Sequence, residues 1–190
     1  MVISIKEKKW TRENIMELTR EEVIELWKQC PAVEMTELVG EFDGLIPNPG
    51  DEERQRRTAE KMYNENSPQG YWLGKAYWPL SKTKGDGYNR YRRPGGRIER
   101  YMRFSTEMGT SLIDGKPSLM MYYGAYHLRL LPEDMENTLT DEIRKLADGI
   151  YLGMGTAKMP DGSRSEPGHF VLVGPVGEYR RADNPIEELK

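Results

Sequence analysis

Cysteine and histidine are scarce in this chain, whose 190 residues include one cysteine and two histidines. A single cysteine, Cys30, excludes an internal disulfide and a zinc site built from several cysteines. The two histidines, His127 and His169, lie far apart and form neither an H-x-H nor an H-E-x-x-H pattern. The residues themselves therefore predict no metal site and no cofactor.

Long apolar runs are also missing. No stretch approaches the ~20 apolar residues that a membrane-spanning helix needs, so no membrane partner is expected. The first ten residues, MVISIKEKKW, are charged and lack the apolar core of a signal peptide, which predicts a cytoplasmic protein. The formal net charge of −3 disfavours recruitment of nucleic acid or of an anionic membrane by overall electrostatics. Phosphate-binding loops and nucleophile-elbow motifs are absent as well.

The residues present suit one globular domain. Hydrophobic residues make up 37% of the chain and aromatic residues 9%, and the aromatic residues are spread along it. A chain of this length hides enough surface to fold without disulfides. A homo-oligomer is compatible with this composition.

Residues 1–67 carry helical signals. Thr19 and Glu22 form a capping box before an apolar stripe, and Pro31 ends the helix that follows. A second helix is expected over residues 51–65, and residues 35–45 are expected to form a short helix that runs into a loop. Since these segments have few apolar residues, we expect them to pack on the rest of the domain.

Residues 68–180 read as strands and turns, and residues 181–190 as a tail. Aromatic or β-branched runs near 71–78, 87–93, 97–104, 112–113, 118–126, 150–156 and 169–173 are separated by turn signals such as P-G-G at 94–96. Residues 141–147 fit either a helix or a strand, and the Asp148-Gly149 turn favours a strand. Seven to nine short strands without intervening helices predict an antiparallel sandwich or barrel with N-terminal helices, in the α+β class.

The segment G-Y-W-L-G at residues 70–74 carries a resemblance. It is similar to the G-x-W that opens the first strand of lipocalin-like (calycin) barrels and to the GXWXG-motif family. A second block at residues 141–153, D-E-I-R-K-L-A-D-G-I-Y-L-G, resembles a later block of that family. The resemblance covers roughly residues 70–175 and implies an antiparallel lipocalin-like β-barrel with a small-molecule cavity. Trp72 would plug the closed end of this barrel or contact the ligand.

The same motif is similar to haem-binding barrels of the nitrobindin type. In those proteins a late histidine ligates iron, and His169 would be the corresponding residue. The present chain departs from their motif at Lys75-Ala76, where those proteins have a further glycine.

One strand, at residues 118–127, combines methionine and tyrosine on both faces. Alternation places Met120, Tyr122 and Tyr126 on one face. Tyr123 and His127 share the other face with Leu119 and Met121. Such a wall suits an apolar or aromatic ligand, and Tyr123 and His127 could move protons. The alternative is that His127 simply ends a strand in solvent.

Arginine is concentrated in the hairpin at residues 88–103, where only Glu99 opposes it. The six arginines are Arg90, Arg92, Arg93, Arg97, Arg100 and Arg103. Three readings are open: a solvated outer face, a pocket that grips one anion, and a surface for single-stranded nucleic acid. If Ile98, Met102 and Phe104 pack outward under the N-terminal helices, Tyr101 and Arg103 line the cavity. Arg103 would then pair with a ligand carboxylate or with Glu107 or Asp141.

These observations predict a small-molecule-binding barrel. The ligand would be apolar or aromatic, with an anionic or carbonyl group. Tyr123, His127 and Arg103 are the candidate catalytic residues of a cofactor-independent isomerase, cyclase or lyase, and Trp72, Tyr101, Met120, Tyr122 and Tyr126 are the candidate ligand contacts. The alternatives are a non-catalytic carrier or sensor, and a protein that binds single-stranded nucleic acid through the arginine hairpin.

Overall fold

The computed structural model describes residues 4–5, 9–125 and 139–180 of the chain. Four helices precede or interrupt the first strands: α1 (Arg12–Met16), α2 (Arg20–Gln29), the 3₁₀ helix η1 (Met35–Glu37) and α3 (Glu52–Met62). None of the described helices is long and apolar enough to cross a membrane. The predicted capping box starts α2, because the Thr19 side chain accepts from the Glu22 amide and the Glu22 carboxylate accepts from the Thr19 amide. Helix α2 ends at Gln29, and its C-cap, Cys30, comes just before Pro31.

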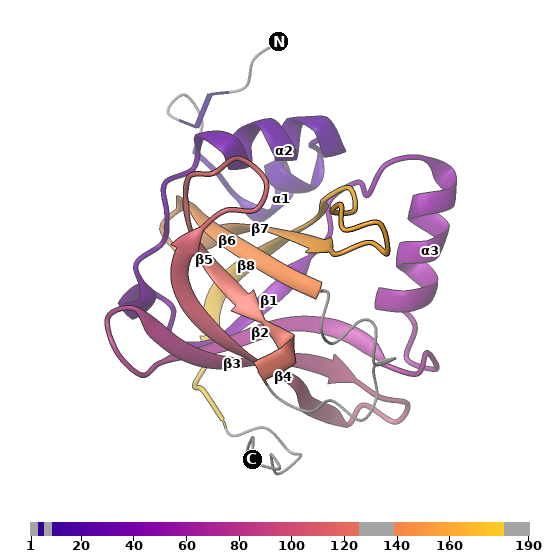
Figure 1. Ribbon diagram of the computed structural model, residues 1–190. Helices are drawn as coiled ribbons and strands as arrows, with labels where there is room; N and C mark the ends of the chain where they lie inside the picture. The colour runs from indigo at the N-terminus through magenta and orange to yellow at the C-terminus, as the bar shows by residue number, and fades with distance from the viewer. Residues whose placement is uncertain (1–3, 6–8, 126–138, 181–190) are drawn as a thin grey trace.

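Eight antiparallel strands form one closed barrel in which each strand pairs with its sequence neighbours and β8 returns to β1 (Figure 1). The strands are β1 (Gly40–Leu45), β2 (Tyr71–Pro79), β3 (Lys84–Arg92), β4 (Ile98–Thr110), β5 (Pro117–Tyr122), β6 (Leu139–Ala147), β7 (Ile150–Ala157) and β8 (Gly168–Gly177). A short 3₁₀ turn, η2 (Tyr123–Ala125), follows β5. This up-and-down closure is the architecture of lipocalin-type barrels, and the predicted fold class is confirmed.

The barrel begins earlier in the chain than the sequence predicted. Residues 35–45 were expected to form a short helix and a loop within a helical segment 1–67, but only η1 is helical and Gly40–Leu45 forms β1. This strand pairs with β2 on one side and β8 on the other, so tertiary pairing decides its conformation. The G-Y-W-L-G segment therefore lies in the second strand. The first strand reads G-E-F-D-G-L, and its Phe42 is completely buried.

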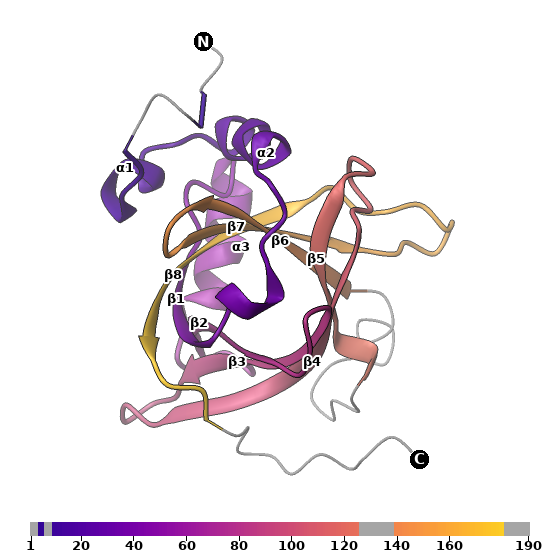
Figure 2. The same cartoon turned by 90° about the vertical axis from the view of Figure 1, so that its left-hand side faces the viewer.

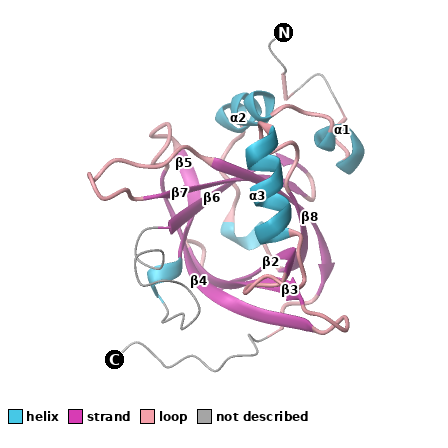
Figure 3. Cartoon of the chain, turned by 90° about the vertical axis from the view of Figure 1, so that its right-hand side faces the viewer, coloured by secondary structure: helices cyan, strands magenta, loops and turns pink. Residues whose placement is uncertain are grey.

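Two apolar cores lie on the two sides of the barrel wall. One fills the barrel interior and includes Phe42, Trp72, Tyr77, Phe104 and Phe170. The other lies between the N-terminal helices and the outer faces of β6, β7 and β8, and it contains Trp27 of α2. Figure 2 shows α2 above these strands, and Figure 3 shows α3 along a different side of the barrel. Helices α2 and α3 therefore brace the outside of the barrel, whereas Met35 of η1 joins the interior core.

Two irregularities in the strands decide which side chains enter the barrel. In β2 the register shifts between Trp72 and Gly74, so that Trp72 and Lys75 both point inward. In β4 the shift falls at Met102, which has a φ of 52°, so that Tyr101 and Phe104 both join the interior core. Each extra residue reverses the alternation of side chains beyond it.

Gly74 is required by this geometry. Its φ is +132°, and a Cβ built on it would lie 2.1 Å from the carbonyl oxygen of Phe42 in β1. Replacing Gly74 by alanine should lower the free energy of unfolding by about 3–5 kcal/mol, because backbone of a paired strand would have to move. The control G95A has a comparable positive φ of +82° but nothing within 4 Å of its Cβ. It should lose only about 1–2 kcal/mol in a urea titration. Equal losses in the two variants would contradict this account of β2.

Candidate functional site

A polar cluster lies inside the barrel. It consists of Lys75 of β2, Asn89 of β3, Tyr123 of η2 and Asp141 of β6, and we call it the Lys75 cluster. The Lys75 Nζ lies 2.9 Å from Asp141 Oδ2 and donates to Asn89 Oδ1 at 3.0 Å and to the Tyr123 hydroxyl at 2.5 Å. The Tyr123 hydroxyl in turn donates to Asp141 Oδ2 at 2.7 Å. Side chains from three strands and one turn thus meet at a single point.

Aromatic rings surround this point. The Lys75 Nζ lies 5.1 Å from the ring centroid of Phe170, 5.2 Å from those of Phe104 and Tyr123, and 6.0 Å from that of Trp72. The Trp72 indole also donates to Asn89 Oδ1 at 3.1 Å. The Lys75 ammonium therefore sits among π-faces that attract a cation, away from water.

Burial sets the electrostatics of the Lys75 cluster. The side chains of Lys75 and Asp141 are only 4% and 9% exposed. Burial lowers the pKa of Lys75, and the Asp141 carboxylate opposes this shift by stabilising the ammonium. Burial and then the charge of Asp141 raise the pKa of Tyr123 well above its ordinary value, so its hydroxyl stays a proton donor at neutral pH. The cluster thus holds an ammonium, a tyrosine proton and a carboxylate within hydrogen-bonding distance.

Asp141 is a member of the Lys75 cluster that the sequence-based prediction did not assign to the site, although the sequence carries a signal for it. Asp141 shares a strand face with the apolar residues Leu139 and Ile143, which marks it as an acid on an inward face. It was considered only as a partner for Arg103. Lys75 gave no such signal, since simple alternation from Trp72 would point it outward and only the shift before Gly74 turns it in.

The structure places the predicted residues of β2 and β4 on different sides of the wall. Trp72 and Tyr101 are buried in the interior core, as expected for both. Arg103 is bound to Asp86, with its Nε 2.7 Å from Asp86 Oδ1, and Asp86 also accepts from Tyr179. The expectation that Arg103 is the interior cation is wrong, because the shift at Met102 turns Phe104 inward and Arg103 outward. Lys75 occupies the position beside Asp141 that was expected for Arg103.

Of the residues predicted in and next to strand β5, some lie inside the barrel and others lie on its outer face. Tyr123 is interior, and so are Leu119 and Met121, the latter accepting a hydrogen bond from Tyr77. Met120 lies on the opposite face, where a side chain on Gly109 would touch it, and Tyr122 is 38% exposed. The expectation that Met120 and Tyr122 line the cavity is therefore wrong. Tyr126 and His127 lie outside the described residues.

Each arginine of the 88–103 hairpin has a carboxylate partner. Those partners come mostly from other segments: Arg90 and Arg100 with Glu41, Arg92 with Glu65, Arg93 and Arg97 with Glu99, and Arg103 with Asp86. The local excess of positive charge along the sequence is thus offset in space. The hairpin arginines that pair with Glu41 do not form the solvated outer face that was one of the three predictions, because the side chains of Arg90 and Arg100 are only 10% and 12% exposed.

His169 lies on the outer side of β8, since its neighbour Phe170 belongs to the interior core. Its Nε2–H donates to the carbonyl oxygen of Pro47, and it lines a hollow with Arg20 and Arg54. A histidine that faces away from the interior does not fit a haem bound inside the barrel. Within the described ranges, no group of three or more His, Cys, Asp or Glu side chains is arranged to hold a metal ion.

Comparison with known proteins supports the fold. No family model matches the chain, and no curated protein does so, so membership of the GXWXG family stays a prediction. A solved structure of a protein from Thermomonospora curvata has a TM-score of 0.52 and 20% identity, covering 83% of this chain and 88% of that one. A bovine odorant-binding protein complexed with its natural ligand has a TM-score of 0.38 and 17% identity, covering 74% and 73%. The first of these likenesses shows a shared fold.

The buried imidazole of His169 predicts a pH dependence of stability. Burial lowers its pKa, so as pH falls below about 6.5 the unfolded chain takes up a proton before the folded chain does. Stability should therefore fall with pH. In the variant H169Q, the glutamine side-chain amide can still donate a hydrogen bond to the carbonyl oxygen of Pro47, but no group at this position takes up a proton. The stability advantage of the wild type over H169Q should shrink by up to about 1.4 kcal/mol per pH unit below pH 6.5 in urea titrations. Parallel curves for the two proteins would contradict this.

Proposed function

We propose that the barrel interior binds a small apolar or aromatic molecule that carries a carbonyl or anionic oxygen, and that the Lys75 cluster engages that oxygen. The observation that carries the proposal is the meeting of Lys75, Tyr123 and Asp141 among aromatic rings in a closed barrel. Ligand sites in proteins combine apolar walls with a few convergent polar groups in this way.

The energetics of the cluster support a role beyond stability. Taking an ammonium and a carboxylate out of water costs several kcal/mol, which their mutual attraction rarely exceeds. Apolar residues of similar volume would fill the same space at no such cost. Ionisable groups kept in an apolar interior are therefore candidates for a functional site.

The chemistry available to this cluster is proton transfer next to a carbonyl group. Asp141 would remove a proton from the carbon beside the carbonyl, the C–H electron pair would form the enolate double bond, and the carbonyl oxygen would become an oxyanion. The Lys75 ammonium would stabilise that oxyanion, and Tyr123 would give its proton to a carbon of the enolate. The protonated Asp141, which is hydrogen-bonded to Tyr123, would then pass its proton to the Tyr123 oxygen, so that both groups return to their starting state. Isomerisation, cyclisation and elimination all proceed through such an enolate without a cofactor. Lys75 takes the role that the sequence suggested for Arg103.

A carrier or sensor is the second candidate, and a specific observation favours it. The Lys75 Nζ already has three oxygen partners, on Asn89, Tyr123 and Asp141. A ligand oxygen must displace one of these partners before any chemistry begins. A protein that only holds its ligand needs no more than that exchange.

Proton exchange on a simple ketone distinguishes these functions. We expect the wild type to bind 4-phenylbutan-2-one and to exchange the protons beside its carbonyl for deuterium in D₂O, followed by ¹H NMR. K75M and Y123F should slow the exchange about 100-fold or more. Y122F is the matched control, since Tyr122 is the exposed neighbour on the other face, and it should leave the rate unchanged.

The remaining outcomes separate the alternatives. Binding that K75M weakens, without any exchange, would favour the carrier. Binding and exchange that K75M and Y123F leave untouched would show that the Lys75 cluster is not the site. Native mass spectrometry of the freshly purified chain, with an absorption spectrum of the same sample, would identify the class of any molecule that the barrel retains.

A further inference from the structure

We propose that a groove beneath α3, outside the barrel, binds an amphipathic monocarboxylate, with its carboxylate on Arg20 and Arg54. We call it the α3 groove. It consists of two adjoining hollows of about 450 and 410 Å³, which share the lining residues Ile46, Pro49 and Thr58. Each hollow falls within the size range of small-molecule sites, roughly 300–1,000 Å³. This site is independent of the Lys75 cluster.

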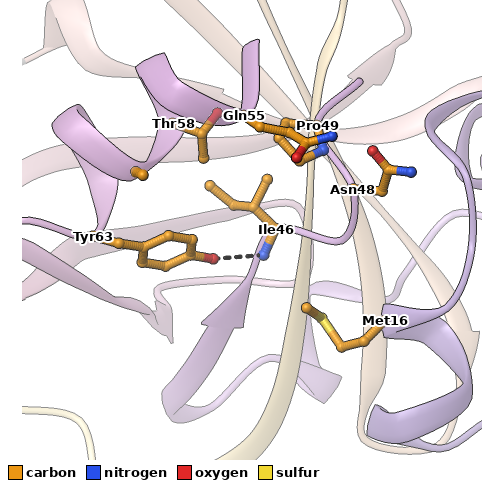
Figure 4. A pocket seen from close by; sticks show the side chains of 8 residues that line it. Met16, Ile46, Asn48, Pro49, Gln55, Thr58 and Tyr63 are labelled. Carbon is orange, nitrogen blue, oxygen red and sulfur yellow. Dashed lines mark hydrogen bonds between the residues drawn. The ribbon is translucent and has the colours of Figure 1, made fainter. Parts of the chain in front are cut away.

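One half of the α3 groove combines apolar side chains with the polar side chains of Asn48, Gln55 and Thr58. Met16, Ile46, Ala59 and Tyr63 line it, as Figure 4 shows for the first, second and fourth of these. The Tyr63 hydroxyl accepts a hydrogen bond from the Ile46 amide at 2.9 Å, which directs the ring along the wall of the hollow. A hydrocarbon or aryl body would fit against these side chains.

The other half of the groove is charged. Arg20, Arg54 and Arg57 line it together with Glu166. The Arg20 side chain is only 14% exposed and is fixed by a hydrogen bond of 2.8 Å from its Nη2 to the carbonyl oxygen of Pro167. A held guanidinium in a hollow that Ile46, Pro49 and Pro167 also line suits the carboxylate of an amphipathic molecule, because the fork of N–H donors matches the two oxygens.

The chain's own Glu166 already shows where a carboxylate binds. Its Oε2 lies 2.6 Å from Arg54 Nη2 and 3.6 Å from Arg20 Nη2, between the two guanidiniums. The Glu166 side chain is 70% exposed, so it can turn into water with little loss of stability. A ligand carboxylate would take its position and, unlike Glu166, would bring an apolar body into the adjoining hollow.

Charges around the groove limit the ligand to a single negative charge. Arg54 lies 3.8 Å from Asp51, and Arg57 pairs with Glu53 on the same helix. The positive charge left for a ligand is therefore small. A monocarboxylate is accommodated by this balance, whereas a ligand with several phosphates would be repelled by the nearby carboxylates.

His169 holds the segment that the two hollows share. Its ring donates to the carbonyl oxygen of Pro47, between the lining residues Ile46 and Pro49. Because this ring is buried and also lines the charged hollow, His169 is a positioning residue for the groove.

Calorimetric titration with 4-phenylbutyrate and with its neutral amide tests the proposal. The wild type should bind the carboxylate at millimolar or lower concentration and the amide about tenfold more weakly. R54Q should weaken carboxylate binding about tenfold, whereas E166Q should strengthen it severalfold because the internal competitor is gone. The matched control is R56Q, since Arg56 lies on the same helix but pairs with Glu60 and does not line the groove.

Four results would overturn the proposal: no binding of the carboxylate at millimolar concentration, equal binding of the amide, weaker binding by E166Q, or an equal effect of R54Q and R56Q. K75M separates the α3 groove from the barrel interior. Carboxylate binding that K75M leaves unchanged supports the groove. Binding that K75M abolishes and R54Q does not would place the probe inside the barrel and contradict the proposal.

Discussion

The ion pair between Lys75 and Asp141 constrains the whole barrel interior. Two opposite charges 2.9 Å apart, almost without exposure, must be matched by other polar groups, and Asn89 and Tyr123 complete the set. Aromatic rings then seal the site from water, which strengthens each electrostatic interaction within it. Strands β2, β3 and β6 and the turn η2 each supply one member of this set.

Glycine and irregular strand geometry make this arrangement attainable. At Gly74 the backbone of β2 comes so close to β1 that no side chain fits, and the register shift there turns Lys75 inward. At Gly155 of β7, a Cβ would lie 2.6 Å from Asp141 Oδ1, so the absent side chain leaves room for the carboxylate. The barrel wall thus has glycines at two positions where a side chain would collide, at Gly74 with β1 and at Gly155 with the Asp141 carboxylate.

The architecture follows from the sequence more closely than the site does. Turn signals between aromatic runs predicted the antiparallel barrel, and the capping box at Thr19 predicted the start of α2. Strand β1 escaped prediction because its polar sequence is extended only through pairing with β2 and β8. For the site, Trp72 and Tyr123 lie in the interior, but alternation alone left open which face of each strand points inward. Arg103 points outward because one extra residue at Met102 reverses the pattern. Local periodicity carries no information on such shifts, which arise from closing the barrel.

The division between inside and outside gives the protein two unlike surfaces. The interior is aromatic and contains the Lys75–Asp141 ion pair. The outer surface carries the N-terminal helices, arginines that pair with carboxylates, and the α3 groove. Buried arginines on the outer side, such as Arg144 against Trp27 and Asp114, anchor helix α2 to the barrel wall. The buried arginines that anchor the helix thus lie outside the barrel, whereas the Lys75 cluster lies inside it.

We infer that the Lys75 cluster is kept for binding and chemistry and not for stability. Unfolding of the double variant K75M/D141L in urea tests this directly, beside the single variant D141L. We expect D141L alone to lose about 3–5 kcal/mol of unfolding free energy, because an unpaired ammonium is left buried. The double variant should be at least as stable as the wild type. A double variant that loses as much as D141L would contradict it, since the ion pair would then be a structural element of the barrel.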